Sequence, residues 1–183
     1  MVKRAFFLDR DGVINPEVNY LHEPDKAALI PGVAEALTTI HRAGFMVVAV
    51  TNQAGVAKGF YPERDIAAVH ARLQSLLLAS GGAEATVDAW YYCPHHPQFT
   101  GPCACRKPGA GMLLRAAEDF ALDLKNSFMV GDRMSDLEAG RNAGCAVCCL
   151  VRTGYGVNEV EKARAAGFSE AADLPDAVRM LLR

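Results

Sequence analysis

Short apolar runs alternate along this chain with segments of helical periodicity, and this alternation limits the possible folds more than any other feature. Five of the runs are too short for typical helices and rich in strand-forming residues; they cover residues 4–8, 45–50, 86–92, 127–130 and 146–151. Helices are predicted from Pro31 to a stop at Gly44, from Pro62 onward, at 136–143 and at 175–182. Strands joined through helices require crossover connections, so the pattern predicts a Rossmann-like α/β fold with a mostly parallel sheet and helices on both faces.

Length and charge limit the organisation and the partners of the chain. Its 183 residues can bury a core without disulfides, and no repeat or linker divides them, so we expect a single domain over residues 1–183. The 19 basic and 21 acidic side chains nearly balance, whereas a protein that mainly binds nucleic acid carries a clear Lys/Arg surplus. No apolar run reaches the ~20 residues of a membrane span, and the first segment meets a charge too early for a signal peptide. We therefore expect a cytoplasmic monomer with no nucleic-acid or membrane partner.

Polar residues follow four of the predicted strands, at the point where each strand ends. These segments are residues 9–12 (DRDG), 51–53 (TNQ), 93–96 (CPHH) and 131–133 (GDR). In open parallel sheets, ligands bind beyond the carboxyl ends of the strands. We therefore expect the functional site at this edge.

Two of these segments are acidic. Asp9 and Asp11 precede Gly12, which permits a sharp turn, and Asp132 and Asp136 follow a later strand. The alternatives are an ordinary turn for the first segment and helix caps for Asp132 and Asp136. An EF-hand is excluded because the required glycine and glutamate positions do not match. Two acidic strand ends that meet at one edge instead predict a hard divalent cation.

These acidic residues, taken with Thr51 and Lys107, resemble the haloacid dehalogenase (HAD) superfamily of phosphotransferases. The resemblance rests on order and spacing across nearly the whole chain: residues 9–12, Thr51 after the run VVAV, Lys107, and Gly131-Asp132 with Asp136. It implies a Mg²⁺-dependent phosphatase that works through an aspartyl-phosphate. A pocket that combines a cation, a hydroxyl and a lysine also suits a phosphoryl group chemically.

The resemblance implies a role for each matching residue. Asp9 is the nucleophile that takes the phosphoryl group. Asp11 is the general acid that protonates the leaving alcohol and then the base that activates water, and its main-chain carbonyl is a further Mg²⁺ ligand. Asp132 completes the Mg²⁺ site with Asp9, and Thr51 and Lys107 hold the phosphoryl oxygens. A carboxylate nucleophile divides the hydrolysis into two easier displacements.

Three thiols and one imidazole gather in the segment 93–105. Cys93, His95, Cys103 and Cys105 form a Cys₃His set, which is the composition of a closed, tetrahedral structural Zn²⁺ site. Disulfides or three buried thiols are the alternatives, and both are less common in a cytoplasmic chain. Four protein ligands leave no open position, so we expect the zinc to be structural rather than catalytic. The other cysteines, at 145, 148 and 149, are expected in the core.

The residues around this segment resemble one particular family within the HAD superfamily. Residues 91–97 (YYCPHHP), 103–108 (CACRKP) and 51–53 (TNQ) are similar to the D-glycero-D-manno-heptose 1,7-bisphosphate 7-phosphatase family and its histidinol-phosphatase relatives. This implies a small phosphorylated sugar as substrate, with removal of its 7-phosphate during the synthesis of lipopolysaccharide precursors. Histidinol-phosphate phosphatase, or a phosphatase for another small sugar phosphate, is the alternative. A non-catalytic phosphate-binding module is the alternative from another class.

The spacing of the motifs leaves no room for a large cap domain, so specificity is expected to come from loops at an open site. The residues expected to bind substrate are Asn52, Gln53, Arg106 and Arg133, together with Glu17, Asn19 and Tyr20. A plain surface turn is the alternative for the loop that holds the last three.

Overall fold

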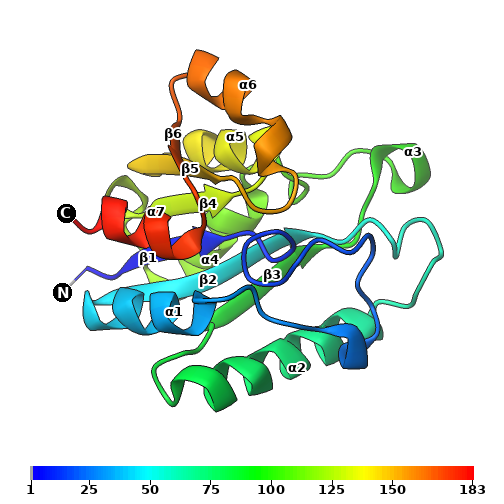
Figure 1. The fold of residues 1–183 in the computed structure, drawn as a ribbon. Coiled ribbons are helices and arrows are strands. Elements are labelled where there is room, and N and C mark those ends of the chain that lie inside the picture. Colours follow the sequence, from blue (N-terminus) through cyan, green and yellow to red (C-terminus); the bar gives the residue numbers. More distant parts are fainter. Residues whose placement is uncertain (1) are drawn as a thin grey trace.

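The computed structural model describes residues 2–183, and within them six strands form one sheet (Figure 1). The strands are β1 (Arg4–Leu8), β2 (Phe45–Asn52), β3 (Ala89–Cys93), β4 (Phe128–Gly131), β5 (Val147–Val151) and β6 (Ser169–Ala171). Their order is β3-β2-β1-β4-β5-β6 and every neighbouring pair is parallel, as the alternation of strands and helices predicts. The order reverses at β1, so β1 and its neighbours mark the switch point where such sheets bind ligands.

Helices connect the strands and cover both faces of the sheet. The α-helices are α1 (Val33–Arg42), α2 (Arg64–Gly81), α3 (Pro97–Thr100), α4 (Gly111–Phe120), α5 (Met134–Ala143), α6 (Val160–Ala165) and α7 (Leu174–Leu181). The short 3₁₀ helices are η1 (Pro24–Lys26), η2 (Leu124–Asn126) and η3 (Gly156–Asn158). Within residues 2–183, none of these helices has the length and apolar character needed to cross a bilayer.

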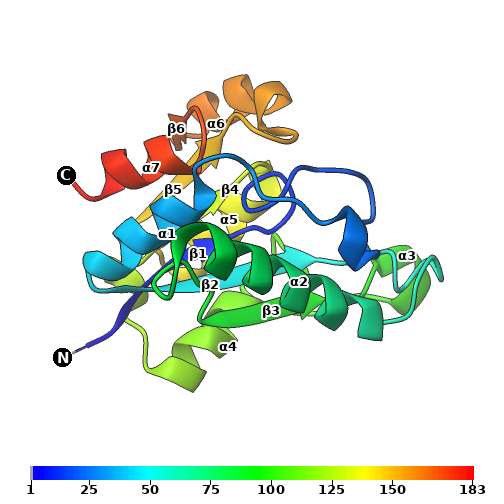
Figure 2. The same cartoon turned by 60° about the horizontal axis from the view of Figure 1, so that its bottom comes forward.

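The side chains of β1 alternate between two hydrophobic cores, one on each face of the sheet. Phe6 and Leu8 pack in the core under α1 and α7, whereas Ala5 and Phe7 pack in the core under α4 and α5. Figure 2 shows α1, α2 and α7 on one side of the sheet and α4 on the other. Burial on both faces explains why β1 reads as a continuous apolar run instead of an alternating one.

The five predicted strands all occur, with small shifts at their ends. The run at 86–92 begins regular pairing only at Ala89. Just before it, the main-chain N–H of Asp88 donates to the Val47 oxygen (2.9 Å), and the Asp88 carboxylate accepts from the Val47 N–H (2.7 Å). The helix predicted from Pro31 begins at Val33, since Gly32 has a left-handed φ of 81°. The elements β6, α3, α4 and α6 were not predicted from the sequence.

Candidate active site

Polar side chains from several strand ends meet in a cavity of about 350 Å³ at the carboxyl edge of the sheet. The cavity is lined by all the residues predicted to bind substrate and by all four predicted catalytic residues: Asp9, Asp11, Glu17, Asn19, Tyr20, Thr51, Asn52, Gln53, Arg106, Lys107 and Arg133. Lys58, Tyr61, His96 and Tyr155 also line it. Lys58, Tyr61 and Tyr155 were not predicted, because they lie outside any local motif and reach the cavity only through the fold. His96 lies in the segment 93–96 but was not assigned to the cavity.

Three buried carboxylates form the acidic centre of this cavity. Asp9 follows β1, whereas Asp132 and Asp136 follow β4, and one oxygen from each lies within 4.8 Å of the others. Main-chain Tyr155 N–H donates to Asp132 Oδ2 (2.7 Å). Asp132 Oδ1 is buried without a hydrogen-bond partner among residues 2–183. A buried acceptor without a partner is costly, so this oxygen is suited to a cation.

Close packing around Asp132 depends on a glycine in the first acidic segment. Gly12 has a φ of 83°, and a Cβ at this position would overlap the Asp132 carboxylate. The sharp turn predicted at Gly12 therefore also lets the acidic segment after β1 approach the one after β4.

Asp136 performs more than one task in this cluster. The main-chain N–H of Arg133 donates to Asp136 Oδ2 (3.0 Å), so Asp136 caps α5. A helix cap was one of the alternatives that the sequence left open for this residue. Its Oδ1 forms an ion pair with Lys107 Nζ (2.7 Å). Arg133 rather than Asp132 occupies the N-cap position, so the alternative of a helix cap is wrong for Asp132.

Lys107 lies between two of these carboxylates and makes the centre strongly polar. Its Nζ also contacts Asp9 Oδ1 at 2.8 Å, and its side chain is 1% exposed. Burial opposes the charge of this ammonium, but Asp136 and Asp9 outweigh it, so the pKa of Lys107 is raised. Three carboxylates against one ammonium leave two negative charges in excess if all are ionised, which is the charge that Mg²⁺ would balance.

The excess negative charge perturbs the carboxyl groups themselves. Burial, together with Asp136 and Asp11, raises the pKa of Asp9 to about 7 despite the opposing charge of Lys107. Burial and the two neighbouring carboxylates raise the pKa of Asp132 to about 8. These carboxyl groups hold protons more tightly in the folded protein than in the unfolded chain, where the value is 3.8.

We therefore expect the metal-free protein to lose stability as pH rises from about 4 to about 8, because the unfolded chain releases these protons first. Mg²⁺ binds the ionised carboxylates, so the increase in melting temperature on adding Mg²⁺ should be larger at pH ~8 than at pH ~6. Thermal unfolding with and without Mg²⁺ at both pH values measures this. An equal or smaller increase at the higher pH would contradict the metal assignment.

The side chain of Asp11 is directed to a different set of partners. Its carboxylate accepts hydrogen bonds from Arg10 (2.9 Å from Nη2), Asn15 Nδ2 (2.9 Å) and Gln53 Nε2 (2.9 Å). The Arg10 side chain is fully buried, whereas that of Asp11 is 17% exposed, so the guanidinium end of this ion pair is the shielded one. The carboxylate cluster thus contains Asp136 in addition to Asp9 and Asp132, and it does not include the Asp11 side chain. Metal binding by the Asp11 main-chain carbonyl stays a prediction.

The two amides of the second motif contact the protein as well as the cavity. Asn52 donates to the main-chain oxygen of Lys107 and accepts from its N–H, both at 3.1 Å. This pair of bonds fixes the lysine loop to the end of β2. Gln53 is 3% exposed and bonds Asp11, Thr51 and Tyr61. Substrate binding by Asn52 and Gln53 stays a prediction.

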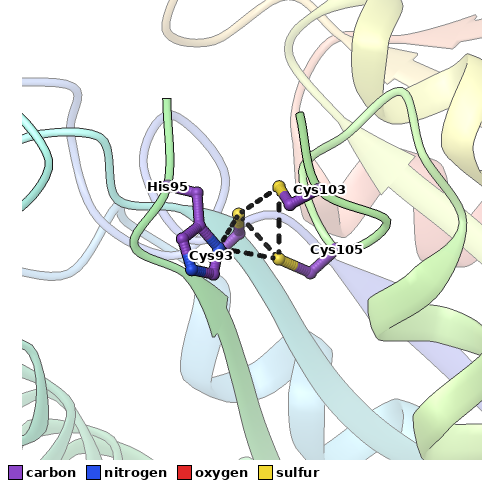
Figure 3. Close-up of side chains that lie close together, drawn as sticks. All are labelled: Cys93, His95, Cys103 and Cys105. Atoms are coloured by element: carbon purple, nitrogen blue, oxygen red, sulfur yellow. Dashed lines mark hydrogen bonds between the residues drawn. The ribbon is translucent and has the colours of Figure 1, made fainter. Parts of the chain in front are cut away.

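The predicted zinc ligands lie together at the end of β3 (Figure 3). The Sγ atom of Cys93 is 2.9 Å from that of Cys105 and 3.6 Å from that of Cys103, and His95 Nδ1 is 3.3 Å from Cys105 Sγ. These sulfur separations are well beyond the ~2.05 Å of a disulfide bond. All four ligand atoms lie within 4.8 Å of one another, so the set can surround one tetrahedral metal ion.

The remaining cysteines are core residues, as expected. Cys148 and Cys149 are buried, and Cys145 is half-buried. Burial raises the pKa of the Cys149 thiol to about 12 and that of Cys148 to about 11. All three lie outside the Cys₃His set.

A loop on one side of the cavity contacts a second loop across its mouth. Asn19 and Tyr20 have left-handed φ values of 51° and 60°, which are uncommon without glycine. Asn19 Oδ1 accepts a hydrogen bond from the Tyr155 hydroxyl (3.1 Å), and the Arg133 guanidinium lies 3.7 Å from the Tyr155 ring centre. Glu17 lies 3.9 Å from Arg133. The loop at 17–20 is therefore part of the cavity wall and is not a plain surface turn.

Comparisons with known proteins agree with this arrangement. A family model described as HAD-hydrolase-like matches residues 104–178. A D-glycero-D-manno-heptose-1,7-bisphosphate 7-phosphatase of Thermosynechococcus vestitus is 43% identical over 184 residues, which cover 96% of this chain and 90% of the relative. The D-glycero-beta-D-manno-heptose-1,7-bisphosphate 7-phosphatase of Escherichia coli K12 is 39% identical over 181 residues, covering 96% and 93%.

A solved structure shows the same similarity. The D,D-heptose 1,7-bisphosphate phosphatase of B. bronchiseptica, complexed with magnesium and phosphate, superposes with a TM-score of 0.87. It is 35% identical, and the match covers 98% of each chain.

Proposed function

The chain belongs to the D-glycero-D-manno-heptose 1,7-bisphosphate 7-phosphatase family of HAD-like hydrolases, and we propose from this that it hydrolyses the 7-phosphate of a D-glycero-D-manno-heptose 1,7-bisphosphate. The observation that carries the proposal is the convergence of Asp9, Asp132 and Asp136 with Lys107 in one buried centre. This centre pairs a candidate nucleophile with groups that can neutralise a phosphoryl group.

Mg²⁺ would be held by Asp9 and Asp132, with Asp136 beside them. The orphaned Oδ1 of Asp132, the excess negative charge and the all-oxygen donor set fit a hard divalent cation. When bound, Mg²⁺ would offset the repulsion between the phosphoryl oxygens and the Asp9 carboxylate. Zn²⁺ would be held by the Cys₃His set at the end of β3, where it would have a structural role.

Asp9 would act as the nucleophile. Lys107 bonds Asp9 Oδ1, which orients the carboxylate and leaves Oδ2 to attack the phosphorus. The bond between phosphorus and the sugar oxygen breaks as the aspartyl-phosphate forms, and this oxygen takes a proton from Asp11. Lys107 and the Thr51 hydroxyl would stabilise the charge on the equatorial phosphoryl oxygens.

Asp11 would act as the base in the second half of the reaction. Water attacks the phosphorus of the aspartyl-phosphate and gives its proton to Asp11, which restores the acid form for the next turnover. The phosphorus–oxygen bond to Asp9 breaks, and inorganic phosphate leaves with the nucleophile regenerated.

Cationic side chains at the cavity favour a substrate with a second phosphate. Lys58, Arg106 and Arg133 all line the cavity outside the acidic centre. Arg106 is fixed there because its Nη1 donates to the main-chain oxygen of His95 (3.1 Å). The imidazole of His95 is one of the predicted zinc ligands. A bisphosphate would place its second anion among these cations. Histidinol phosphate would bring its ammonium group toward them, which is electrostatically unfavourable.

Phosphate release tests this assignment most simply. Purified protein with Mg²⁺ is given both anomers of the heptose bisphosphate and, separately, histidinol phosphate. We expect kcat/KM for at least one heptose anomer to exceed that for histidinol phosphate by about 100-fold or more, because the second phosphate contributes binding energy. A preference for histidinol phosphate would overturn the substrate assignment and leave the catalytic groups in place.

A further inference from the structure

The side-chain amide of Gln53 joins three groups around the phosphoryl site. Its Nε2 lies 2.9 Å from Asp11 Oδ2 and 2.9 Å from Thr51 Oγ1, whereas its Oε1 lies 2.8 Å from the Tyr61 hydroxyl. Gln53 and Tyr61 are both buried, and Thr51 is 1% exposed. The hydrogen bonds in this network are therefore protected from competition with water.

The network has one consistent direction of hydrogen bonding. An ionised Asp11 can only accept, so the amide must present Nε2 to it. The second N–H of Nε2 then points to Thr51, which accepts through Oγ1. The hydroxyl hydrogen of Thr51 is consequently left to donate elsewhere, and Thr51 lines the cavity where the phosphoryl group would bind.

The opposite orientation of the amide would reverse the role of Thr51. Oε1 would then accept the Thr51 hydroxyl hydrogen and remove it from the phosphoryl site. It would also face the carboxylate of Asp11, and two acceptors in contact repel each other. A second group also holds the amide in the first orientation.

Tyr61 supplies that constraint. Its hydroxyl donates to Gln53 Oε1, and among the described residues this is the hydrogen bond that the phenol donates. Reversal of the amide would leave a buried O–H without an acceptor. Burial raises the pKa of Tyr61 to about 12, so the phenol keeps the proton that it donates.

The ring of Tyr61 is itself held from both sides. His22 stacks on it with an interplanar angle of 3° and a centroid distance of 5.0 Å. A Cβ on Gly55 would overlap the ring, so glycine at this position lets the main chain approach it. The phenol is thus fixed by packing independent of the hydrogen bond.

We propose that Tyr61, acting through Gln53, is a positioning residue that keeps the Thr51 hydroxyl as a hydrogen-bond donor to the phosphoryl group. The inference rests on the proposed function, because it takes Thr51 as a phosphoryl ligand. It adds Tyr61 to the catalytic arrangement as a residue that acts through Gln53.

Tyr61→Phe tests the proposal because it removes the hydroxyl and keeps the ring. We expect kcat to fall roughly tenfold while KM and the Mg²⁺ requirement change less than about threefold, since the lost donor acts mainly in the transition state. Tyr92→Phe is the matched control: it removes a hydroxyl that bonds Glu63 at 2.8 Å outside the cavity, and it should keep wild-type kcat. Wild-type kcat in Tyr61→Phe would overturn the proposal.

A double-mutant cycle with Thr51→Val distinguishes positioning from a general structural effect. If Tyr61 acts through Thr51, adding Tyr61→Phe to Thr51→Val should reduce kcat by less than about twofold. A full tenfold further loss would overturn the proposal. Gln53→Glu places an acceptor where Nε2 donates, and it should lose about 100-fold in kcat. The added carboxylate beside Asp11 should also lower the melting temperature, so kcat is measured at a temperature where the variant is folded.

Binding of orthovanadate, measured by calorimetry without substrate, separates this inference from the proposed function. Vanadate can adopt the five-coordinate geometry of phosphoryl transfer, so Tyr61→Phe should weaken its binding about tenfold, and Tyr92→Phe should not. Equal binding by Tyr61→Phe and wild type would overturn the inference. A wild-type protein that binds vanadate but releases no phosphate from heptose bisphosphates would instead contradict the proposed substrate.

Discussion

Asp9→Asn is expected to lower phosphate release by about 10⁴-fold or more, because an amide cannot form the aspartyl-phosphate. The fold should survive. Lys107 keeps its ion pair with Asp136 at 2.7 Å, and the substitution removes one of three mutually repelling buried carboxylates. The melting temperature of the metal-free variant should therefore equal or exceed that of the wild type. Phosphate-release kinetics and thermal unfolding measure the two effects.

Asp25→Asn provides a matched control, since it makes the same chemical change at an exposed position in η1. It should keep wild-type activity and stability. Near-normal turnover by Asp9→Asn would exclude Asp9 as the nucleophile. A melting temperature well below that of the wild type would show that the lost activity reflects unfolding.

Cys105→Ser is expected to have the second-largest effect. Loss of one thiolate should reduce the zinc content from about one per chain to near zero and lower the melting temperature by roughly 10 °C. Turnover should fall about 100-fold, because Cys105 lies two residues before Lys107 and anchors the loop that places Lys107 against Asp9. Metal analysis, thermal unfolding and phosphate release are measured on the same preparation.

Cys145→Ala is the control for this experiment. Cys145 lies outside the Cys₃His set, so its replacement should leave both the zinc content and the turnover unchanged. A Cys105→Ser protein that retains a full zinc and full activity would contradict the ligand assignment. Fully active wild-type protein without zinc would contradict the structural role of the metal.

The centre of the fold could be predicted from the sequence because burial of each central strand leaves a pattern within the strand itself. β1, β2 and β4 lie in the middle of the sheet, where burial on both faces requires a continuous apolar run. The polar residue that ends each run is then conspicuous. Asp9, Thr51 and Asp132 could therefore be placed at one edge before the geometry was known.

The periphery was harder to predict because its elements depend on tertiary contacts. β6 has three residues, Ser169–Ala171, and carries too little pattern to identify as a strand without its partner β5. The helix α4 begins at Gly111, within the segment Gly109-Ala110-Gly111, which reads locally as a turn. The main-chain N–H of Gly111 donates to the oxygen of Ala104 (3.1 Å), a tertiary contact at the start of the helix.

The site shows the same division between local and distant causes. The sequence predicts which residues reach the cavity edge, but it does not predict the hydrogen-bond partners toward which their side chains point. Asn52 bonds the main chain of Lys107, which lies 55 positions later, and Tyr61 reaches Gln53 through a loop with no recognisable motif. The dual role of Asp136 as helix cap and ion-pair partner also depends on Lys107, which approaches it from another part of the chain.

Chemical trapping tests the central claim, that Asp9 forms the phosphorylated intermediate, most directly. Wild-type protein is mixed with heptose bisphosphate and Mg²⁺, quenched during turnover and treated with borohydride, which reduces an aspartyl-phosphate to homoserine. Peptide mass spectrometry should find homoserine at position 9, dependent on both substrate and Mg²⁺. Homoserine at another aspartate, or turnover that proceeds with Asp9 never modified, would contradict the account.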